Sequence, residues 1–192
     1  MLNYNDMKHI LSTILFFFFV ASMAAQSAAQ KIAVKVTAGK FTINKVEVTT
    51  GWKQDAVSVA LKGNDRRRAG FNTTHSYDAF GIVLFEKNND KLPSGILSEV
   101  QFYFGAMDSN NVKPTGLFVG KLQVEKLKIT SALTPDEMKA ALKDYLVTDS
   151  YMEHNFRLVY KGLYIYFLFN NEDTQLLKIS VGPDARGPNG TL

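Results

Sequence analysis

Two related stretches decide the fold: KFTINKVEVT at residues 40–49 and KLQVEKLKIT at residues 121–130. They agree position by position in apolarity and share lysines at 40/121 and 45/126, and the second follows the first at an offset of 81 residues. At the same offset, GIVLF at 81–85 falls on GLYIY at 162–166. Chance explains any one of these matches but not several at one offset and in order, so the sequence indicates an internal duplication.

Each copy of this stretch has the pattern of a β-hairpin. Before Asn44-Lys45 the apolar residues occupy odd-numbered positions (41 and 43), and after it they occupy even-numbered ones (46 and 48). The same change of phase occurs around Glu125-Lys126, from 122 and 124 to 127 and 129. A change of phase across two residues marks a two-residue hairpin turn. The sequence therefore predicts one hairpin near the start of each copy.

A short helix should follow each hairpin. In the first copy Gly63 is placed to end the helix, and the buried face should carry Trp52, Ala56, Val59 and Ala60. In the second copy, TPDE at 134–137 is a capping box with proline at the first helical position. Its buried stripe should consist of Met138, Ala141, Leu142 and Tyr145.

Two long strands complete each copy. The strand over 96–104 alternates, with one face formed by Ile96, Ser98, Val100, Phe102 and Phe104 and a wetter face formed by Leu97, Glu99, Gln101 and Tyr103. By contrast, 82–85 and 163–169 are apolar on both faces, so the helix can cover one side and the opposite copy or a partner protein must cover the other.

The predicted fold class is α+β, with two tandem pseudo-symmetric units, each made of a hairpin, one helix and antiparallel strands. A unit of about 80 residues lies near the size below which a lone core stabilises a domain by only a few kcal/mol. We therefore expect the two units to pack together. The first repeat should span 31–105 and the second 117–182, followed by a flexible tail over 183–192, which holds two prolines and two glycines.

The N-terminal segment has the order of a secretory signal. Lys8 and His9 precede an apolar stretch over 14–20 and a run of small residues over 21–25. The apolar stretch falls short of the roughly 20 residues that a spanning helix needs. The sequence thus predicts a signal peptide over 1–29, export to the periplasm or the extracellular space, and no permanent membrane span. Cleavage after Ala24, Ala25 or Ala29 stays open.

The composition is typical of a folded domain, with 46% hydrophobic, 12% aromatic and 21% charged residues. A net charge of +4 is too small and too dispersed to indicate a nucleic-acid partner. The chain has no cysteine, so neither a disulfide nor a lipid-bearing cysteine is expected. The dense basic spot Arg66-Arg67-Arg68 should lie in a loop, either merely solvated or facing an acidic protein or an anionic lipid surface.

The motifs of catalysis and metal binding are missing from the sequence. His9, His75 and His154 stand isolated, so no metal site is predicted. No nucleophile motif and no phosphate-binding glycine loop occur, so neither a catalytic residue nor a cofactor is assigned. Asp78, Glu86 and Glu99 could converge on neighbouring strands as a carboxylate site, although exposed charges at strand edges explain them as well.

Aromatic residues are the feature that favours recognition. Tyrosine and tryptophan provide rigid contact area with a polar tip, and they are common anchors of protein interfaces. Tyr103, Tyr164 and Tyr166 are in phase on the faces predicted to be outer, and Trp52 should lie near the same rim. The candidate binding residues are therefore Tyr103, Tyr164, Tyr166, Trp52, Arg66, Arg67 and Arg68. The alternative is that the tyrosines fill the seam between the two units.

Three short runs carry a resemblance to a known family. YDAFGI at 77–82, FYF at 102–104 and FVGKL at 118–122 resemble an uncharacterised family of bacterial secreted domains, which implies no activity. The doubled order of elements also resembles the two-repeat layout of β-lactamase-inhibitor-like proteins, and each unit is similar to the small outer-membrane assembly lipoproteins. The missing cysteine and the opening hairpin depart from those proteins. Likeness at the level of fold does not fix function.

Together these features favour an exported, non-catalytic protein that binds another envelope or secreted protein as inhibitor, immunity factor or assembly partner. One alternative is a hydrolase with an unrecognised carboxylate site. The other is a structural component of the envelope that associates with itself.

Overall fold

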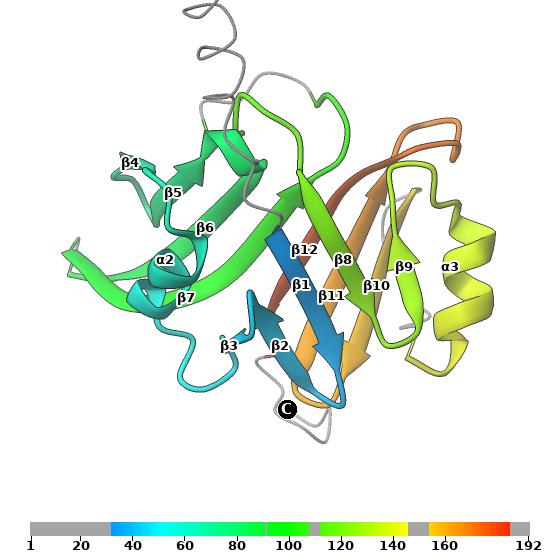
Figure 1. Ribbon diagram of the computed structural model, residues 1–192, viewed down its shortest axis with the longest axis horizontal. Helices are drawn as coiled ribbons and strands as arrows, with labels where there is room; N and C mark the ends of the chain where they lie inside the picture. Colours follow the sequence, from blue (N-terminus) through cyan, green and yellow to red (C-terminus); the bar gives the residue numbers. More distant parts are fainter. Residues whose placement is uncertain (1–31, 91, 108–111, 146–153, 185–192) are drawn as a thin grey trace, which may run out of the picture. The chain divides into compact units, whose positions relative to one another are not determined.

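The computed structural model describes residues 32–90, 92–107, 112–145 and 154–184, which form two β-sheets, two α-helices and two short 3₁₀ turns (Figure 1). This is the α+β class that the sequence predicts. The predicted signal peptide and all but the first two residues of the predicted tail lie outside the described residues. In the part that is described, no helix combines the length and apolarity needed to cross a membrane.

The smaller sheet has five strands in the order β3-β2-β1-β8-β9. Its strands are β1 (Ile32–Thr37), β2 (Lys40–Ile43), β3 (Val46–Glu47), β8 (Gly120–Val124) and β9 (Leu127–Ile129). Both predicted hairpins are confirmed, because Ile43 pairs with Val46 and Val124 pairs with Leu127. The parallel pairing of β1 with β8 joins strands from the two predicted repeats in one sheet.

The larger sheet has seven strands, all antiparallel, in the order β10-β11-β12-β7-β6-β5-β4. Its strands are β4 (Arg66–Arg68), β5 (Thr73–Tyr77), β6 (Ile82–Asn89), β7 (Leu92–Tyr103), β10 (Asn155–Tyr160), β11 (Leu163–Phe169) and β12 (Leu176–Pro183). Pairing of β7 with β12 again joins the two predicted repeats. Residues from both repeats therefore share one continuous backbone hydrogen-bond network in each sheet.

Helix α3 (Pro135–Leu142) begins as the sequence predicts. The backbone N–H of Glu137 donates to Thr134 Oγ1 (3.3 Å), and the backbone N–H of Thr134 donates to Glu137 Oε2 (3.1 Å), which completes the capping box. Met138 and Leu142 are buried as predicted, but Ala141 is exposed. Tyr145 lies beyond the helix in the short 3₁₀ turn η2 (Lys143–Tyr145) and is half-buried.

Helix α2 (Gln54–Leu61) differs from its predicted form in the face that it buries. The buried residues are Val57, Ala60 and Leu61, whereas Val59 is 69% exposed. The prediction counted the helical period from Trp52, but Trp52 lies in the turn before the helix, so the buried face is rotated. The helix also ends earlier than expected, because Lys62, rather than Gly63, takes the left-handed conformation (φ 50°).

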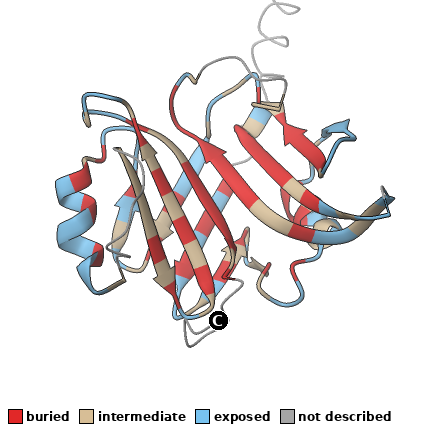
Figure 2. Ribbon diagram, turned by 180° about the vertical axis from the view of Figure 1, so that it is seen from behind, coloured by how far each residue is buried: buried red, intermediate tan, exposed pale blue. Residues whose placement is uncertain are grey.

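The core lies between the inner faces of the two sheets. Phe41 of β2 meets Phe102 of β7 edge-on, with ring centroids 6.2 Å apart. Along β11, burial alternates strictly, with Leu163, Ile165, Phe167 and Phe169 buried. Figure 2 views the larger sheet from behind and shows this alternation of buried and intermediate residues along β11. The residues of intermediate burial on β11 lie on the outer face of the larger sheet, which points away from the smaller sheet.

Strand β7 departs from the predicted alternation near its start. Phe85 pairs with Glu99, but Glu86 pairs with Leu97, so Ser98 is an extra residue in a β-bulge. The bulge reverses the phase, and as a result Leu97 is buried while Ile96 is 37% exposed. From Glu99 onward the predicted phase holds, and Val100 and Phe102 are buried in the core.

Candidate functional site

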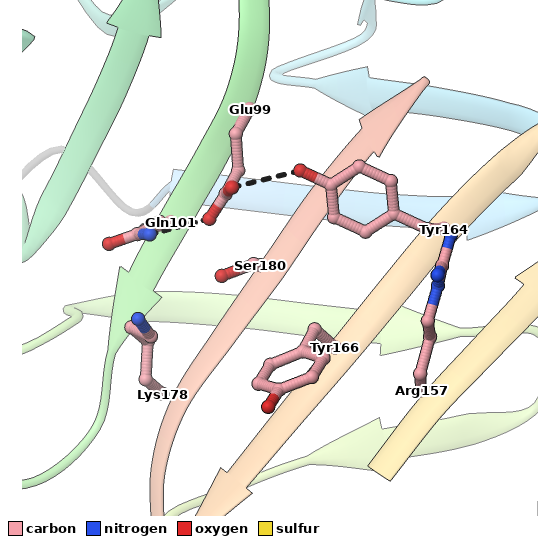
Figure 3. Close-up of a pocket in the computed structure, with 7 residues that line it drawn as sticks. All are labelled: Glu99, Gln101, Arg157, Tyr164, Tyr166, Lys178 and Ser180. Carbon is pink, nitrogen blue, oxygen red and sulfur yellow. Dashed lines mark hydrogen bonds between the residues drawn. The ribbon is translucent and has the colours of Figure 1, made fainter. Parts of the chain in front are cut away.

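A hollow on the outer face of the larger sheet follows from the sizes of its side chains. Strand β12 carries two small residues on this face, Ser180 and Gly182, between the larger residues of β11 and β7. The result is a pocket of about 410 Å³, here called the outer pocket (Figure 3). It is lined by Glu99, Gln101, Arg157, Tyr164, Tyr166, Lys178 and Ser180.

A chain of hydrogen bonds crosses the pocket from β11 to β7. The Tyr164 hydroxyl donates to Glu99 Oε2 (2.9 Å), and the Gln101 side-chain amide donates to Glu99 Oε1 (2.5 Å), as Figure 3 shows. The Tyr103 hydroxyl in turn donates to Gln101 Oε1 (2.6 Å). Each oxygen of the Glu99 carboxylate thus has a donor, which fixes the position of Tyr164 over β12.

Gly182 allows the Tyr164 ring to lie against β12. A Cβ atom at Gly182 would lie 2.4 Å from Cε1 of Tyr164 and 2.5 Å from its hydroxyl oxygen. Real Cβ atoms do not come this close to other heavy atoms, so any side chain at position 182 would displace the ring. Glycine is required here for close approach.

Two cations stand against the aromatic rings of the site. The Arg157 guanidinium lies 5.8 Å from the centroid of the Tyr164 ring, and its Nη2 is 3.3 Å from Oδ1 of Asp184, a carboxylate with a fully buried side chain. The Lys178 ammonium lies 5.9 Å from the centroid of the Tyr103 ring. Both distances are within the range of cation–π attraction. Burial lowers the pKa of Lys178, and the charge of Glu99 acts against that shift.

The tyrosines of the site keep their phenolic protons well above neutral pH. Burial raises the pKa of Tyr103 to about 12, and the negative charge of Glu99 acts in the same direction. Burial, followed by the charge of Glu99, also raises the pKa of Tyr164, and burial alone raises that of Tyr166. All three hydroxyls therefore act as hydrogen-bond donors at neutral pH. The outer pocket offers donors, a ring surface and a carboxylate that is already hydrogen-bonded.

The structure brings together some of the residues predicted to bind. Tyr164 and Tyr166 line the outer pocket, and Tyr103 joins it through Gln101 while only 4% of its own surface is exposed. Tyr164 and Tyr166 occupy the outer positions of β11, and the Tyr164 hydroxyl reaches across β12 to Glu99 of the first predicted repeat. Trp52 is 9% exposed and packs on Phe41 in the core (5.8 Å between centroids), and it does not line the pocket.

The predicted loop at Arg66-Arg67-Arg68 is wrong, because these residues form the edge strand β4. Pairing with β5 places Arg66 opposite Ser76 and Arg68 opposite Thr74. Arg66 also donates to Asp78 through its Nε (3.1 Å). A strand of three residues is too short to show an alternating pattern in the sequence. The prediction therefore depended on Gly63-Asn64-Asp65, which is typical of a loop.

Sequence reasoning missed four lining residues of the outer pocket, namely Gln101, Arg157, Lys178 and Ser180. The alternation along 178–182 could have placed Lys178 and Ser180 on one face of a strand. No local signal could have shown that this strand lies between β7 and β11, because that neighbourhood depends on pairing between distant segments.

The three predicted carboxylates each face a different partner. Asp78 accepts from Arg66, Glu99 accepts from Tyr164, and Oε2 of Glu86 lies 2.8 Å from Nε2 of His75. Among the residues that the structure describes, no hydrogen bond links any two of these carboxylates. Each of the three carboxylates therefore has a separate hydrogen-bond partner.

His75 lies between two carboxylates. Its Nδ1 is 2.5 Å from Oδ2 of Asp65, its Nε2 contacts Glu86, and Oε1 of Glu86 accepts from the backbone N–H of Gly95. His75 and Glu86 are 5% and 4% exposed. Both side chains are therefore held by contacts within the protein and shielded from solvent. No group of three or more metal-ligating side chains occurs in the described parts of the chain.

Comparison with known proteins identifies one family. No curated protein and no solved structure matches the chain. One family model matches residues 33–139, from β1 through the connection between the predicted repeats into α3. The match includes Glu99 and Gln101 of the outer pocket and ends before β10, β11 and β12. The chain therefore belongs to the family described as a domain of unknown function, DUF7738.

Proposed function

We propose that the protein is an exported, non-catalytic binding protein, and that its outer pocket engages another protein of the cell envelope. The observation that carries this proposal is the hydrogen-bonded chain that holds Tyr164 and Glu99 in place at an open hollow. Tyrosine and arginine are enriched among the residues that dominate binding energy at protein interfaces, and the pocket combines Tyr164, Tyr166 and Arg157.

Rigidity supports the same proposal. The lining residues stand on four paired strands, β7, β10, β11 and β12, rather than on loops. A site whose side chains are already held in one arrangement loses less conformational entropy when a partner binds. The basic, apolar and small-residue order of the first 25 residues supports placing this binding in the envelope.

We also infer that the two halves arose by duplication and are pseudo-symmetric. Each half contains a hairpin, a helix and three antiparallel strands in the same order: β2–β3, α2 and β5–β7 in the first, and β8–β9, α3 and β10–β12 in the second. Gly81 and Gly162 both have positive φ (65° and 83°) immediately before matched strands. This order supports the resemblance to the two-repeat layout of β-lactamase-inhibitor-like proteins, which also fits a protein-binding role.

A hydrolase with a carboxylate site is the less supported alternative, since Asp78, Glu86 and Glu99 face separate partners. A self-associating structural component is the other alternative. Light scattering distinguishes it, because a binding protein of the proposed kind should be monomeric in the absence of its partner.

The test is capture of a partner by the mature chain from a periplasmic extract. We expect a protein that the wild type retains and that Tyr166→Ala binds roughly tenfold or more weakly, as is typical of a hot-spot truncation. Val119→Ala is the matched control, because Val119 is 51% exposed and lies outside the pocket. Retention that is equal in the wild type and both variants would contradict the proposal, and so would the absence of any captured protein.

A further inference from the structure

The loop between β4 and β5 presents a phenylalanine to solvent. Phe71 is 97% exposed, and Leu92, at the start of β7, is 70% exposed. Single exposed apolar residues are common on protein surfaces, but an aromatic ring that is almost fully exposed on a loop is available for contact with another apolar phase. The outer pocket does not include either residue.

The two exposed apolar residues stand on neighbouring hairpin tips that are bonded together. The side-chain amide of Asn88 donates to the carbonyl of Gly70 (2.9 Å), and the Thr73 hydroxyl donates to Oδ1 of Asn88 (2.9 Å). In Figures 1 and 2 the β4–β5 and β6–β7 hairpins project at the same end of the larger sheet. We call this part of the molecule, residues 66–72, 87–90 and 92, the hairpin end.

Basic residues lie near the two exposed apolar side chains. Arg67, Arg68 and Lys87 are all exposed, and within the described residues none of the three has a carboxylate partner. Successive residues of a strand point to opposite faces, so Arg67 and Arg68 flank the tip on both sides. Asp90 is the acidic residue of the hairpin end, which leaves an excess of positive charge there.

We propose that the hairpin end docks the protein on an anionic lipid surface. Phe71 and Leu92 would enter the boundary between headgroups and acyl chains, and Arg67, Arg68 and Lys87 would contact lipid phosphates. Peripheral attachment of this kind combines buried apolar area with attraction between basic side chains and anionic lipid. A protein partner would need a cavity shaped for Phe71, whereas a lipid layer accepts a protruding ring of any orientation.

The proposal is independent of the outer pocket, because the two sites share no residue. It also differs from a membrane span, since it places only two hairpin tips at the lipid surface. Binding would hold the protein at the membrane through a few side chains and would be reversible.

Co-sedimentation of the mature chain with vesicles tests the proposal. We expect binding to phosphatidylcholine vesicles that contain one quarter phosphatidylglycerol. Binding to pure phosphatidylcholine should be roughly 100-fold weaker, because Arg67, Arg68 and Lys87 all lose their anionic contacts there. Because each basic residue near an anionic surface contributes about a fivefold factor, Arg67→Gln with Arg68→Gln should weaken binding by about 25-fold. Phe71→Ser should weaken it by about fivefold, and the matched control Val119→Ser should leave it unchanged.

A second measurement keeps the test independent of binding strength. The Phe71→Trp variant places a fluorophore at the tip, and its emission should shift to the blue only when anionic vesicles are present. Equal binding to both kinds of vesicle, no binding to either, or an equal loss in Val119→Ser would overturn the proposal. Binding to soluble poly-L-glutamate in place of vesicles would also overturn it, and would assign the hairpin end to an acidic protein.

Discussion

The outer face of the larger sheet differs between its two halves. At the 81-residue offset, Val83 and Phe85 of β6 correspond to Tyr164 and Tyr166 of β11. Val83 is completely buried, whereas Tyr164 and Tyr166 line the open outer pocket. Position 83 is therefore closed while its counterpart 164 is open, and Phe85 is half-buried.

The connection between β7 and β8 accounts for this difference. The Ser76 hydroxyl donates to the carbonyl of Val112 (2.9 Å), and the backbone N–H of Thr115 donates to Oδ1 of Asp78 (2.9 Å). Hydrogen bonding by Arg66 holds the pKa of Asp78 below its usual value, so this anchor stays ionised. Ser76 pairs with Val83, so the bond to Val112 holds this part of the connection beside the position that is closed in the first half.

The charged groups of the larger sheet also differ in their surroundings. His75 and Glu86 are buried and held by partners within the protein. Glu99, on β7, is half-buried at the open outer pocket. Substitutions at His75 or Glu86 should therefore change the stability of the fold, and substitutions at Glu99 should change binding at the outer pocket.

The largest expected effect is at His75. His75→Ala leaves the buried side chain of Glu86 without its imidazole partner, and a buried carboxylate that loses its hydrogen-bond partner costs about 3 kcal/mol or more of unfolding free energy. Urea denaturation measures this change. The matched control is His154→Ala, whose contact with Asp173 is more exposed and should contribute at most about 1 kcal/mol. Similar losses in the two variants would show that burial does not distinguish the two histidines.

An intermediate effect is expected at Gly182. Gly182→Ala forces the Tyr164 ring away from β12, and overpacking of this kind costs about 1–3 kcal/mol. The variant should also lose the hydrogen bond from Tyr164 to Glu99. If the ring is the cause, Gly182→Ala should cost much less in a Tyr164→Ala background, and a double-mutant cycle measures the difference. Additive effects of the two changes would refute this account of the pocket.

The smallest effect at ordinary pH concerns Tyr103. Its pKa of about 12 in the folded chain lies above the value of about 10 in an unfolded chain. Between these values the unfolded chain loses the phenolic proton and the folded chain keeps it. The free energy of unfolding therefore falls by about 1.4 kcal/mol for each unit by which the pH rises above 10. Tyr103→Phe removes this dependence. Urea midpoints measured from pH 9 to 11.5 should therefore converge for the wild type and the variant, and parallel curves would contradict the shift.

Local pattern explains most of what could be predicted. The phase changes at Asn44-Lys45 and Glu125-Lys126 located both hairpins, and the capping box at 134–137 located the start of α3. These signals depend on residues that are close in sequence. The buried face of α2 was wrong because Trp52 was counted inside the helix, and Leu97 was misplaced because a bulge is not visible in an alternating pattern.

The candidate site was predicted only in part. Tyr164 and Tyr166 were singled out by residue type and phase, and both line the outer pocket. Lys178 and Ser180 could not be assigned to the site from the sequence, since they meet Glu99 and Gln101 only because β12 pairs with β7. Trp52 shows the limit of residue type as a guide, because it has the chemistry of an interface anchor and lies in the core.

The amino-acid sequence by itself determined the elements of this protein: hairpins, helices, strand phases and the repeated pattern at an offset of 81 residues. These depend on backbone preference and on the period of apolar residues, which act over a few positions. The tertiary structure alone decided which positions of the outer face are open, because their neighbours come from distant segments, such as Val112 and Thr115, and from long-range strand pairing. Exposure is a property of the whole packed molecule, and no short stretch of sequence contains it.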